Sequence, residues 1–486
     1  MCLFFSILMA SKASWLLCLK GKFANILPLH LQGNPVVSMS IRRSGFFPPL
    51  AVLLLFFTAV PMMTTQAAED AAGLREVFEL ALVYDDAWSA AQARARAAAE
   101  SYPIARAGLL PSLSATGTLG RTHRETDQAG QELSREYAQD TLRLQARQPL
   151  LNRERWMRVR MAQRDADIGG LELDLAYQDL IQRTVNAYLN LLQAQEQRAL
   201  VQAEIDAIDA QMQQIKRMRE GGVATVTDVY EAQARLDLAR AREIEARNLQ
   251  EIRRRELLKI IRQPVGMIKV LGEQAGYERP IPYDMDAWTQ MASDNALEVQ
   301  AQKLALERAG FNVDRARSQH LPTLDGVAAW ERFGNSDLGY ARDRYGRVSL
   351  ELHVPLYMGG RISAETREAR ARFDQALDES ELTRRESELK ASSAFLELSS
   401  SLARIEALEQ AVRSSEVALQ ASEISLSVAY RTFVDVLDAQ QQLYRTRFDL
   451  LGARIEYVRA MVALNAAVGM LNEDTIDHID TWMETF

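Results

Sequence analysis

The chain contains one internal duplication, and this feature restricts its fold more than any other. Four motifs recur in the same order at offsets of 211, 206, 207 and 203 residues, pairing Pro111 with Pro322, Pro149 with Pro355, Asp228 with Asp435, and Gly266 with Gly469. Self-similarity at a nearly constant spacing indicates a repeated structural unit, and this period is far too long for a solenoid repeat. We therefore expect two related units, at 68–286 and 287–486.

Each unit contains very long segments without proline. The pattern predicts helices at 73–107, 152–219 and 225–262 in the first unit and at 361–427 and 432–468 in the second. At 1.5 Å per residue, each of the two longest helices would extend about 100 Å. Because the connections at 220–224 and 428–431 are short, the helices that they join should run antiparallel.

The apolar positions of the long helices form narrow stripes. Ile181, Val185, Tyr188 and Leu192 recur at spacings of three and four. Leu398, Leu402 and Ile405 repeat this pattern in the second unit. Such a stripe predicts a coiled-coil seam between helices rather than one face of a thick core.

Strands are predicted within 111–150 and within 322–357. The even-numbered positions from 348 to 356 are Val, Leu, Leu, Val and Leu, and the odd positions from 347 to 353 are Arg, Ser, Glu and His. This alternation is typical of a transmembrane β-strand, although a soluble half-buried hairpin gives the same pattern. Two hairpins supply four strands, too few to close a barrel in lipid, so two, three or four copies would be required.

The amino terminus has the features of an export signal. Residues 1–67 contain no Asp or Glu, and Arg42 and Arg43 precede an apolar run at 50–57. This order, followed by small residues, predicts a leader at 1–67 that ends at Ala67. We expect Met39 to be its physiological start, with 1–38 as a misassigned extension; the alternative is a long leader that begins at Met1. Both cysteines, Cys2 and Cys18, lie within residues 1–67.

Composition and missing motifs exclude several classes of function. The net charge of −8 argues against a nucleic-acid partner. A mean hydropathy of −0.19 argues against a polytopic helical membrane protein. The phosphate-binding, nucleophile-elbow and zinc-helix motifs are missing from the sequence. We therefore expect no catalytic residues, no metal and no cofactor.

Three motifs resemble the TolC family of outer-membrane export ducts: Gln-His-Leu-Pro-Thr-Leu-Asp at 319–325, Pro-Leu-Tyr-Met-Gly-Gly at 355–360, and Arg-Thr-Phe-Val-Asp-Val-Leu-Asp-Ala at 431–439. The resemblance covers 70–480. It implies a mainly α-helical protein with a transmembrane β part, in which a homotrimer combines a 12-stranded β-barrel in outer-membrane lipid with a periplasmic α-barrel. It also implies a periplasmic adaptor and an inner-membrane transporter as partners in efflux or type I secretion.

Asp435 and Asp438 are the best candidates for a functional site. They are three residues apart, on one face of a helix that begins just after a tight turn. The simplest interpretation is a solvated helix N-terminus, where acidic side chains favour the helix dipole. In a trimer the two positions would instead place six carboxylates around one axis and favour cations. The family has an acidic entrance ring at the matching positions.

The resemblance also assigns roles to neighbouring residues. Thr227, Asp228 and Arg431 would form the links that hold the inner helices closed, although Arg431 could also pair with Asp435 within one helix. Gly222, Val223, Val428 and Ala429 would form the helix tips that contact the adaptor.

The sequence departs from the family at two of these positions. Leu426 replaces a tyrosine that is common in the family, with Tyr430 as a possible substitute, and Ala429 replaces the glycine of the second tip. Two alternative functions need no membrane barrel. One is a periplasmic coiled-coil scaffold with soluble hairpins, and the other is the adaptor component of an export complex, which would have one helical hairpin rather than four long helices.

Overall fold

The computed structural model describes residues 71–128, 131–222, 224–272, 276–335, 341–428 and 430–484. The predicted leader at 1–67, with its start at Met39, lies outside these residues, as do Val223 and Ala429. Helices and strands follow in the order α2 (Leu74–Tyr84), α3 (Asp86–Ala99), α4 (Ser101–Ala107), β1 (Ser112–Gln128), β2 (Gln131–Leu151), α5 (Arg153–Glu220), α6 (Val226–Ile261), β3 (Val270–Leu271), α7 (Met285–Asn295), α8 (Leu297–Ser318), β4 (Thr323–Asn335), β5 (Ala341–His353), α9 (Arg361–Ser427), α10 (Phe433–Ala467), α11 (Glu473–Asp480) and β6 (Met483–Glu484).

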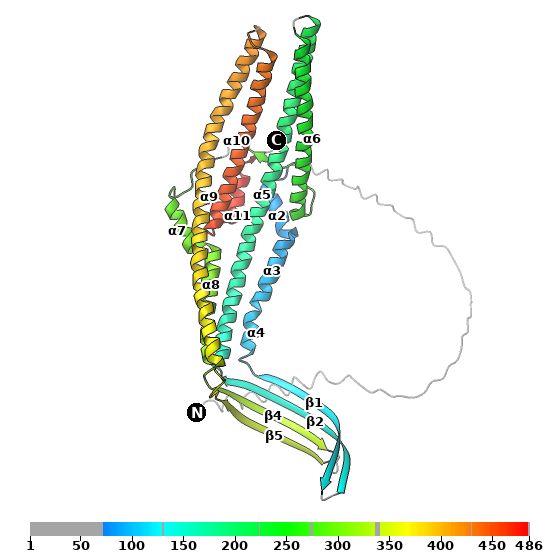
Figure 1. Cartoon of the computed structure of the whole chain (residues 1–486), viewed down its shortest axis with the longest axis vertical. Coiled ribbons are helices and arrows are strands. Elements are labelled where there is room, and N and C mark those ends of the chain that lie inside the picture. Colours follow the sequence, from blue (N-terminus) through cyan, green and yellow to red (C-terminus); the bar gives the residue numbers. More distant parts are fainter. Residues whose placement is uncertain are drawn as a thin grey trace, which may run out of the picture. The chain divides into compact units, whose positions relative to one another are not determined.

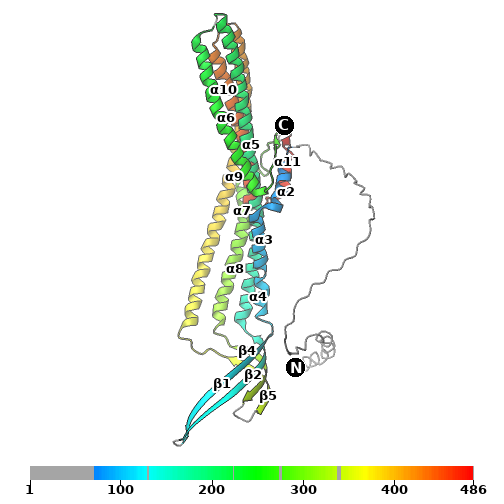
Figure 2. The ribbon, with the colours of Figure 1, turned by 90° about the vertical axis from the view of Figure 1, so that its right-hand side faces the viewer.

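Two long helical hairpins dominate the structure (Figure 1). Helix α5 has 68 residues and packs against α6, and α9 has 67 residues and packs against α10. The bounds of all four helices agree with the predicted ones to within one residue. At the end where α5 and α9 begin, α8 packs against both of them (Figure 2). None of the helices in the described part of the chain is both long and apolar enough to cross a membrane.

The helix predicted at 73–107 is broken into three pieces, so this prediction is wrong in its continuity. Asp85 has an extended backbone, with ψ of 121°, and it caps α3 by accepting a hydrogen bond from the Trp88 N–H at 2.7 Å. Its carboxylate also pairs with Arg183 of α5 at 2.9 Å. The second break, at Glu100, precedes Pro103, which has no N–H to donate in a continuous helix but is tolerated in the first turn of a new one.

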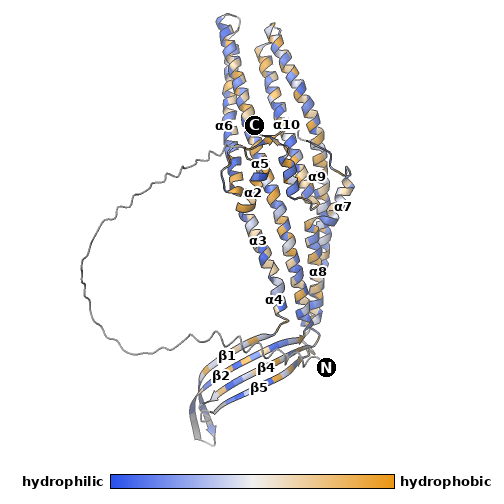
Figure 3. Ribbon diagram, turned by 180° about the vertical axis from the view of Figure 1, so that it is seen from behind, coloured by the Kyte–Doolittle hydropathy of each residue, from blue (hydrophilic) through white to orange (hydrophobic). Residues whose placement is uncertain are grey.

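The four long strands form one antiparallel sheet in the order β1-β2-β4-β5, at the starts of α5 and α9 (Figure 1). One face is apolar across all four strands, because Leu113 pairs with Ala146, Leu144 with Trp330, and Ala328 with Val348. Strand β5 ends at His353, so the predicted alternation at 354–356 continues beyond the strand. Figure 3 shows hydrophobic and hydrophilic residues alternating along the strands.

The opposite face of the sheet carries a ladder of ion pairs. Arg143 of β2 contacts Glu331 of β4 at 2.8 Å, and the Tyr345 hydroxyl of β5 donates to the same carboxylate at 2.7 Å. Arg147 bridges Asp325 at 2.9 Å and Glu351 at 2.8 Å. The arginine and carboxylate side chains of this face thus neutralise one another's charge.

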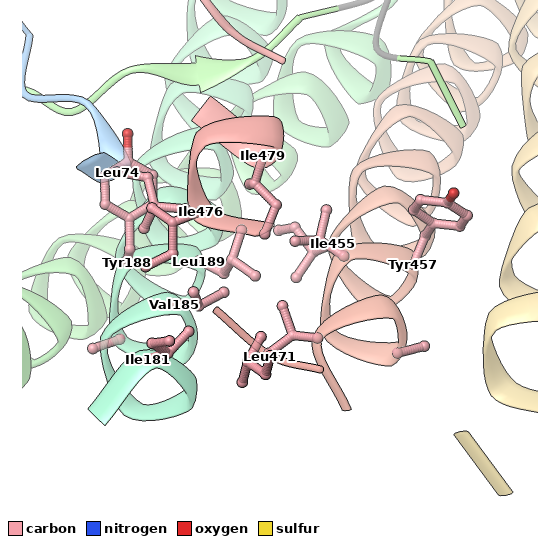
Figure 4. Packing of buried hydrophobic residues seen from close by; sticks show 14 of the residues in the cluster. Leu74, Ile181, Val185, Tyr188, Leu189, Ile455, Tyr457, Leu471, Ile476 and Ile479 are labelled. Carbon is pink, nitrogen blue, oxygen red and sulfur yellow. The ribbon is translucent and has the colours of Figure 1, made fainter. Parts of the chain in front are cut away.

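The main hydrophobic core surrounds the middle of α5, where the sequence predicted only a seam. Ile181, Val185, Tyr188 and Leu192 are at most 1% exposed, because α2 and α11 cover them together with α10 (Figure 4). The buried Tyr188 hydroxyl donates to the backbone carbonyls of Ala72 at 3.1 Å and Lys269 at 3.0 Å. The stripe is therefore one face of a thick core at this level.

Candidate functional site

The candidate site lies at the ends of the two hairpins, where α5 turns into α6 and α9 turns into α10. Figure 1 shows both turns at the end of the long helices that is remote from the sheet. Gly222, in the first turn, has a φ of +75°, a conformation that glycine adopts without steric cost. Val428 ends α9 as its C-cap residue and is 70% exposed. Both positions therefore present a tip to the surroundings.

The two tips begin their second helices with the same capping box. In α6 the Asp228 carboxylate accepts from the Thr225 N–H at 2.8 Å and from the Thr225 hydroxyl at 2.7 Å. In α10 the Asp435 carboxylate accepts from the Thr432 N–H at 2.7 Å and from the Thr432 hydroxyl at 2.8 Å. Reciprocal bonds of this kind satisfy backbone donors that a helix start leaves open.

These hydrogen bonds keep both capping aspartates ionised. The Thr225 hydroxyl and then the Thr225 N–H lower the pKa of Asp228. The Thr432 N–H and then its hydroxyl lower the pKa of Asp435, and the positive charge of Arg431 contributes in the same direction. Each donor favours the charged form of the carboxylate that accepts from it. The predicted site residues Asp228 and Asp435 are therefore anionic at neutral pH, and each is engaged locally as a helix cap.

Arg431 lies outside α10, so the predicted alternative of an intrahelical pair with Asp435 is not what forms. The residue precedes the N-cap Thr432, and its guanidinium donates to the Ser422 hydroxyl of α9 at 2.8 Å. Ser422 is buried, with 1% exposure. Arg431 thus ties the turn back onto its own hairpin.

The remaining tip residues are placed as follows. Thr227 is exposed in the first turn of α6. Tyr430, the possible substitute for the missing tyrosine, is 86% exposed, whereas Leu426 is half-buried near the end of α9. Tyr430 thus directs most of its side-chain surface to solvent in the single chain.

Asp438 has a partner that the sequence reasoning missed. Its carboxylate pairs with Arg235 of α6 at 2.7 Å, across 203 residues of sequence. Arg235 also lies 3.5 Å from Glu231, four residues earlier on the same helix. Glu231 occupies the position in the first unit that corresponds to Asp438 in the second, at the offset of 207. The available sequence signal was Arg235, which follows Glu231 by four residues. This one arginine contacts the acidic residue of both repeats.

A small hydrophobic cluster adjoins this ion pair. Leu437 of α10 is 4% exposed and packs among Ile208, Met212 and Ile215 of α5 and Ala232, Leu236 and Ala239 of α6. Its counterpart in the first unit, Tyr230, is 71% exposed. The duplicated sequence is therefore used asymmetrically, because only the second repeat inserts an apolar side chain into the other hairpin.

Comparison with known proteins agrees with this architecture. The family model for outer membrane efflux proteins matches residues 77–261 and 288–470. The outer membrane protein TolC of Vibrio cholerae is 29% identical over 442 residues, which cover 89% of this chain and 98% of that protein. The alkaline protease secretion protein AprF of Pseudomonas aeruginosa is 30% identical over 415 residues, covering 84% and 86% respectively.

A solved structure shows the same fold at low sequence identity. The CmeC outer membrane channel of Campylobacter jejuni superposes with a TM-score of 0.72 at 15% identity, covering 85% of this chain and 90% of that one. At this identity the likeness concerns the fold alone.

Proposed function

The chain belongs to the outer membrane efflux protein family, and we propose that three copies of it form a duct that crosses the outer membrane and continues into the periplasm. In this proposal the sheets of the three copies close a 12-stranded β-barrel, and the long hairpins form an α-barrel. The duct receives cargo from an inner-membrane transporter through a periplasmic adaptor. Outer-membrane localisation follows from the family; the trimer and the barrel are the proposal.

The open sheet with two different faces is the observation that carries this proposal. Its apolar face includes Leu113, Trp330 and Val348, and its opposite face carries the ion-pair ladder of Arg143 and Arg147. In the described part of the chain, the outer edges of β1 and β5 have no partner strand. Unpaired backbone groups are very costly in hydrocarbon, so a sheet with a lipid-facing side has to close on itself.

Closure requires further copies of the chain. Four strands per copy allow barrels of eight, twelve or sixteen strands, and the family resemblance supports three copies. The ion-pair ladder would then line the interior of the barrel, where water solvates the arginines and carboxylates. The apolar face would meet the lipid tails, which is the arrangement found in transmembrane barrels.

The cargo follows from the relatives only as a class. The Pseudomonas aeruginosa relative is named for the secretion of a protease. We therefore propose export of polypeptides by type I secretion, or efflux of small molecules, with selection by the transporter. A periplasmic scaffold or an adaptor, the two alternatives, would not require the lipid-facing side of the sheet.

The helix tips form the entrance in this proposal. Asp435 and Asp438 contribute carboxylates to the opening, and Gly222, Val223, Val428 and Ala429 contact the adaptor. Thr227, Asp228 and Arg431 act as gating links. Among the described residues, the hydrogen bonds of the Asp228 carboxylate and the Arg431 guanidinium stay within their own hairpins. We therefore place these links between neighbouring copies of the chain.

A pair of arginine substitutions on adjacent residues of β5 tests the barrel. Leu350 is 70% exposed on the apolar face, and Ser349 lies on the opposite face. An arginine on the lipid face costs about 2–4 kcal/mol near the middle of the bilayer, whereas one on the lumen face remains in water. We expect Leu350→Arg to be lost from the outer-membrane fraction and Ser349→Arg to remain there as a detergent-extracted trimer.

The same preparations report whether a duct forms. Wild type and Ser349→Arg should insert as conducting pores in planar bilayers and should have the mass of three chains in detergent. A wild-type protein that is extracted without detergent as a monomer would refute the proposed function. Equal membrane insertion of Leu350→Arg and Ser349→Arg would show that the apolar face does not meet lipid.

A further inference from the structure

We propose that Arg235 is a latch residue, which holds the entrance closed by pairing with Asp438 and at the same time removes Asp438 from the set of free acidic charges at the opening. This inference rests on the proposed duct and concerns the regulation of its entrance. It differs from the expectation based on the sequence, in which both aspartates contribute free carboxylates.

The ion pair runs from one long hairpin to the other. Arg235 lies on α6 and Asp438 on α10, and their atoms are 2.7 Å apart. Among the described residues, this is the ion pair that joins one long hairpin to the other; Arg242 pairs with Glu204 within the α5–α6 hairpin, and Arg447 pairs with Glu416 within the α9–α10 hairpin. Uncharged contacts join the hairpins at this end as well, since the Tyr444 hydroxyl of α10 donates to the Ala203 carbonyl of α5 at 3.4 Å and Leu437 packs into the other hairpin. Arg235 therefore supplies the charged part of this link.

The packing around this ion pair is sparse. A cavity of about 280 Å³ lies directly beside the pair and is lined by Arg235, Leu437 and Asp438, among others. Farther along α10 a second cavity of about 510 Å³ separates Tyr444 from α6. At the level of the ion pair, α10 contributes the buried Leu437 and the partly buried Phe433 to the small cluster between the hairpins. The two hairpins can therefore separate here without disrupting the main core around α5.

The ion pair also changes the charge at the entrance. Asp435 is exposed and remains anionic as a helix cap, whereas the charge of Asp438 is compensated by Arg235. In the closed entrance, Asp438 is therefore ion-paired, whereas Asp435 has no ion pair among the described residues. When the latch opens, Asp438 is released and the negative charge of the entrance rises. Opening and cation affinity are therefore coupled through Arg235.

This coupling predicts opposite effects for the two partners. Arg235→Gln removes the latch and frees Asp438, so pores should open more often and should also be blocked by a lower concentration of a trivalent cation such as hexaamminecobalt(III). Asp438→Asn also removes the latch but frees no charge, so pores should open more often without tighter block. Because the pair is partly exposed, the ratio of open to closed dwell times should rise by up to about fivefold per link.

Two further variants isolate the ion pair. Arg240→Gln is the matched control, because Arg240 lies on the same helix and its ion pair among the described residues is with Asp237 of that helix, at 3.8 Å; it should behave as wild type. The charge-reversed double variant Arg235→Asp with Asp438→Arg should restore wild-type dwell times, whereas each single reversal should open the entrance.

The outcomes separate the latch from the duct itself. If wild type forms no pores, the proposed function fails, and amide exchange over residues 433–440 still tests the latch, since exchange should be faster in Arg235→Gln than in Arg240→Gln. If wild type conducts but Arg235→Gln matches Arg240→Gln in dwell times and block, the latch is refuted. Failure of the double variant to restore wild-type dwell times would also overturn it.

Discussion

Truncating Leu437 should detach the α9–α10 hairpin from the α5–α6 hairpin at the entrance. Leu437 is 4% exposed and is the fully buried α10 side chain in the small cluster at this end. A buried Leu→Ala change costs about 2–5 kcal/mol, as lost apolar burial and as a cavity that the surroundings fill only in part. Since 1.4 kcal/mol is a factor of ten, the ratio of docked to undocked hairpins should fall by at least about 25-fold per chain.

Amide exchange of the purified protein measures this ratio directly. Residues 433–440 and 208–215 should exchange faster in Leu437→Ala than in wild type, while the main core around α5 should be unchanged. Leu238→Ala is the matched control, because Leu238 is 65% exposed on α6 at the same end and its loss should change stability by no more than about 0.5 kcal/mol. Leu437→Met keeps the volume of the side chain and should retain most of the protection.

Two results would refute the reasoning. Equal exchange in Leu437→Ala and Leu238→Ala would show that the cluster does not hold the hairpins together. Faster exchange throughout the α5 core would show that the hairpins do not separate independently of the main fold. In planar bilayers, the same variant should raise the open fraction of the pore relative to Leu238→Ala.

Other perturbations follow from buried or capping groups. Tyr188→Phe removes a hydroxyl that donates to two buried carbonyls, so thermal unfolding should show a loss of about 1–3 kcal/mol. Asp85→Asn removes the buried partner of Arg183 and leaves that arginine paired with Asp179 at 2.6 Å; it should cost about 1–3 kcal/mol, seen as proteolysis between α2 and α3. The pKa of Asp435 is lowered from its usual 3.8. The stability that its ionised carboxylate contributes as a helix cap is therefore complete above pH 3.8 and is lost as the pH falls through the lowered pKa. Amide protection at the start of α10 should accordingly fall with acid in wild type but not in Asp435→Asn.

The long helices could be predicted from sequence because their determinants are local. A helix continues where proline is missing, as at 152–219 and 361–427, and it ends at a glycine turn such as Gly222. Both effects act within a few residues of the chain. The alternation near Leu350 similarly defined the two faces of the sheet, since side chains of a strand point to opposite sides in turn. The capping aspartates also follow a local pattern, with a threonine three residues earlier in each unit.

The tertiary structure decided the features that depend on distant partners. The break at Asp85 is stabilised by Arg183, 98 residues away, which donates to the buried Asp85 carboxylate. The stripe around Tyr188 becomes a core because α2 and α11 fold over it. Sequence periodicity gives the direction of a side chain on its own helix but does not identify the element that covers it. For the same reason the pairing of Arg235 with Asp438, across 203 residues, was visible only once the two hairpins were placed side by side.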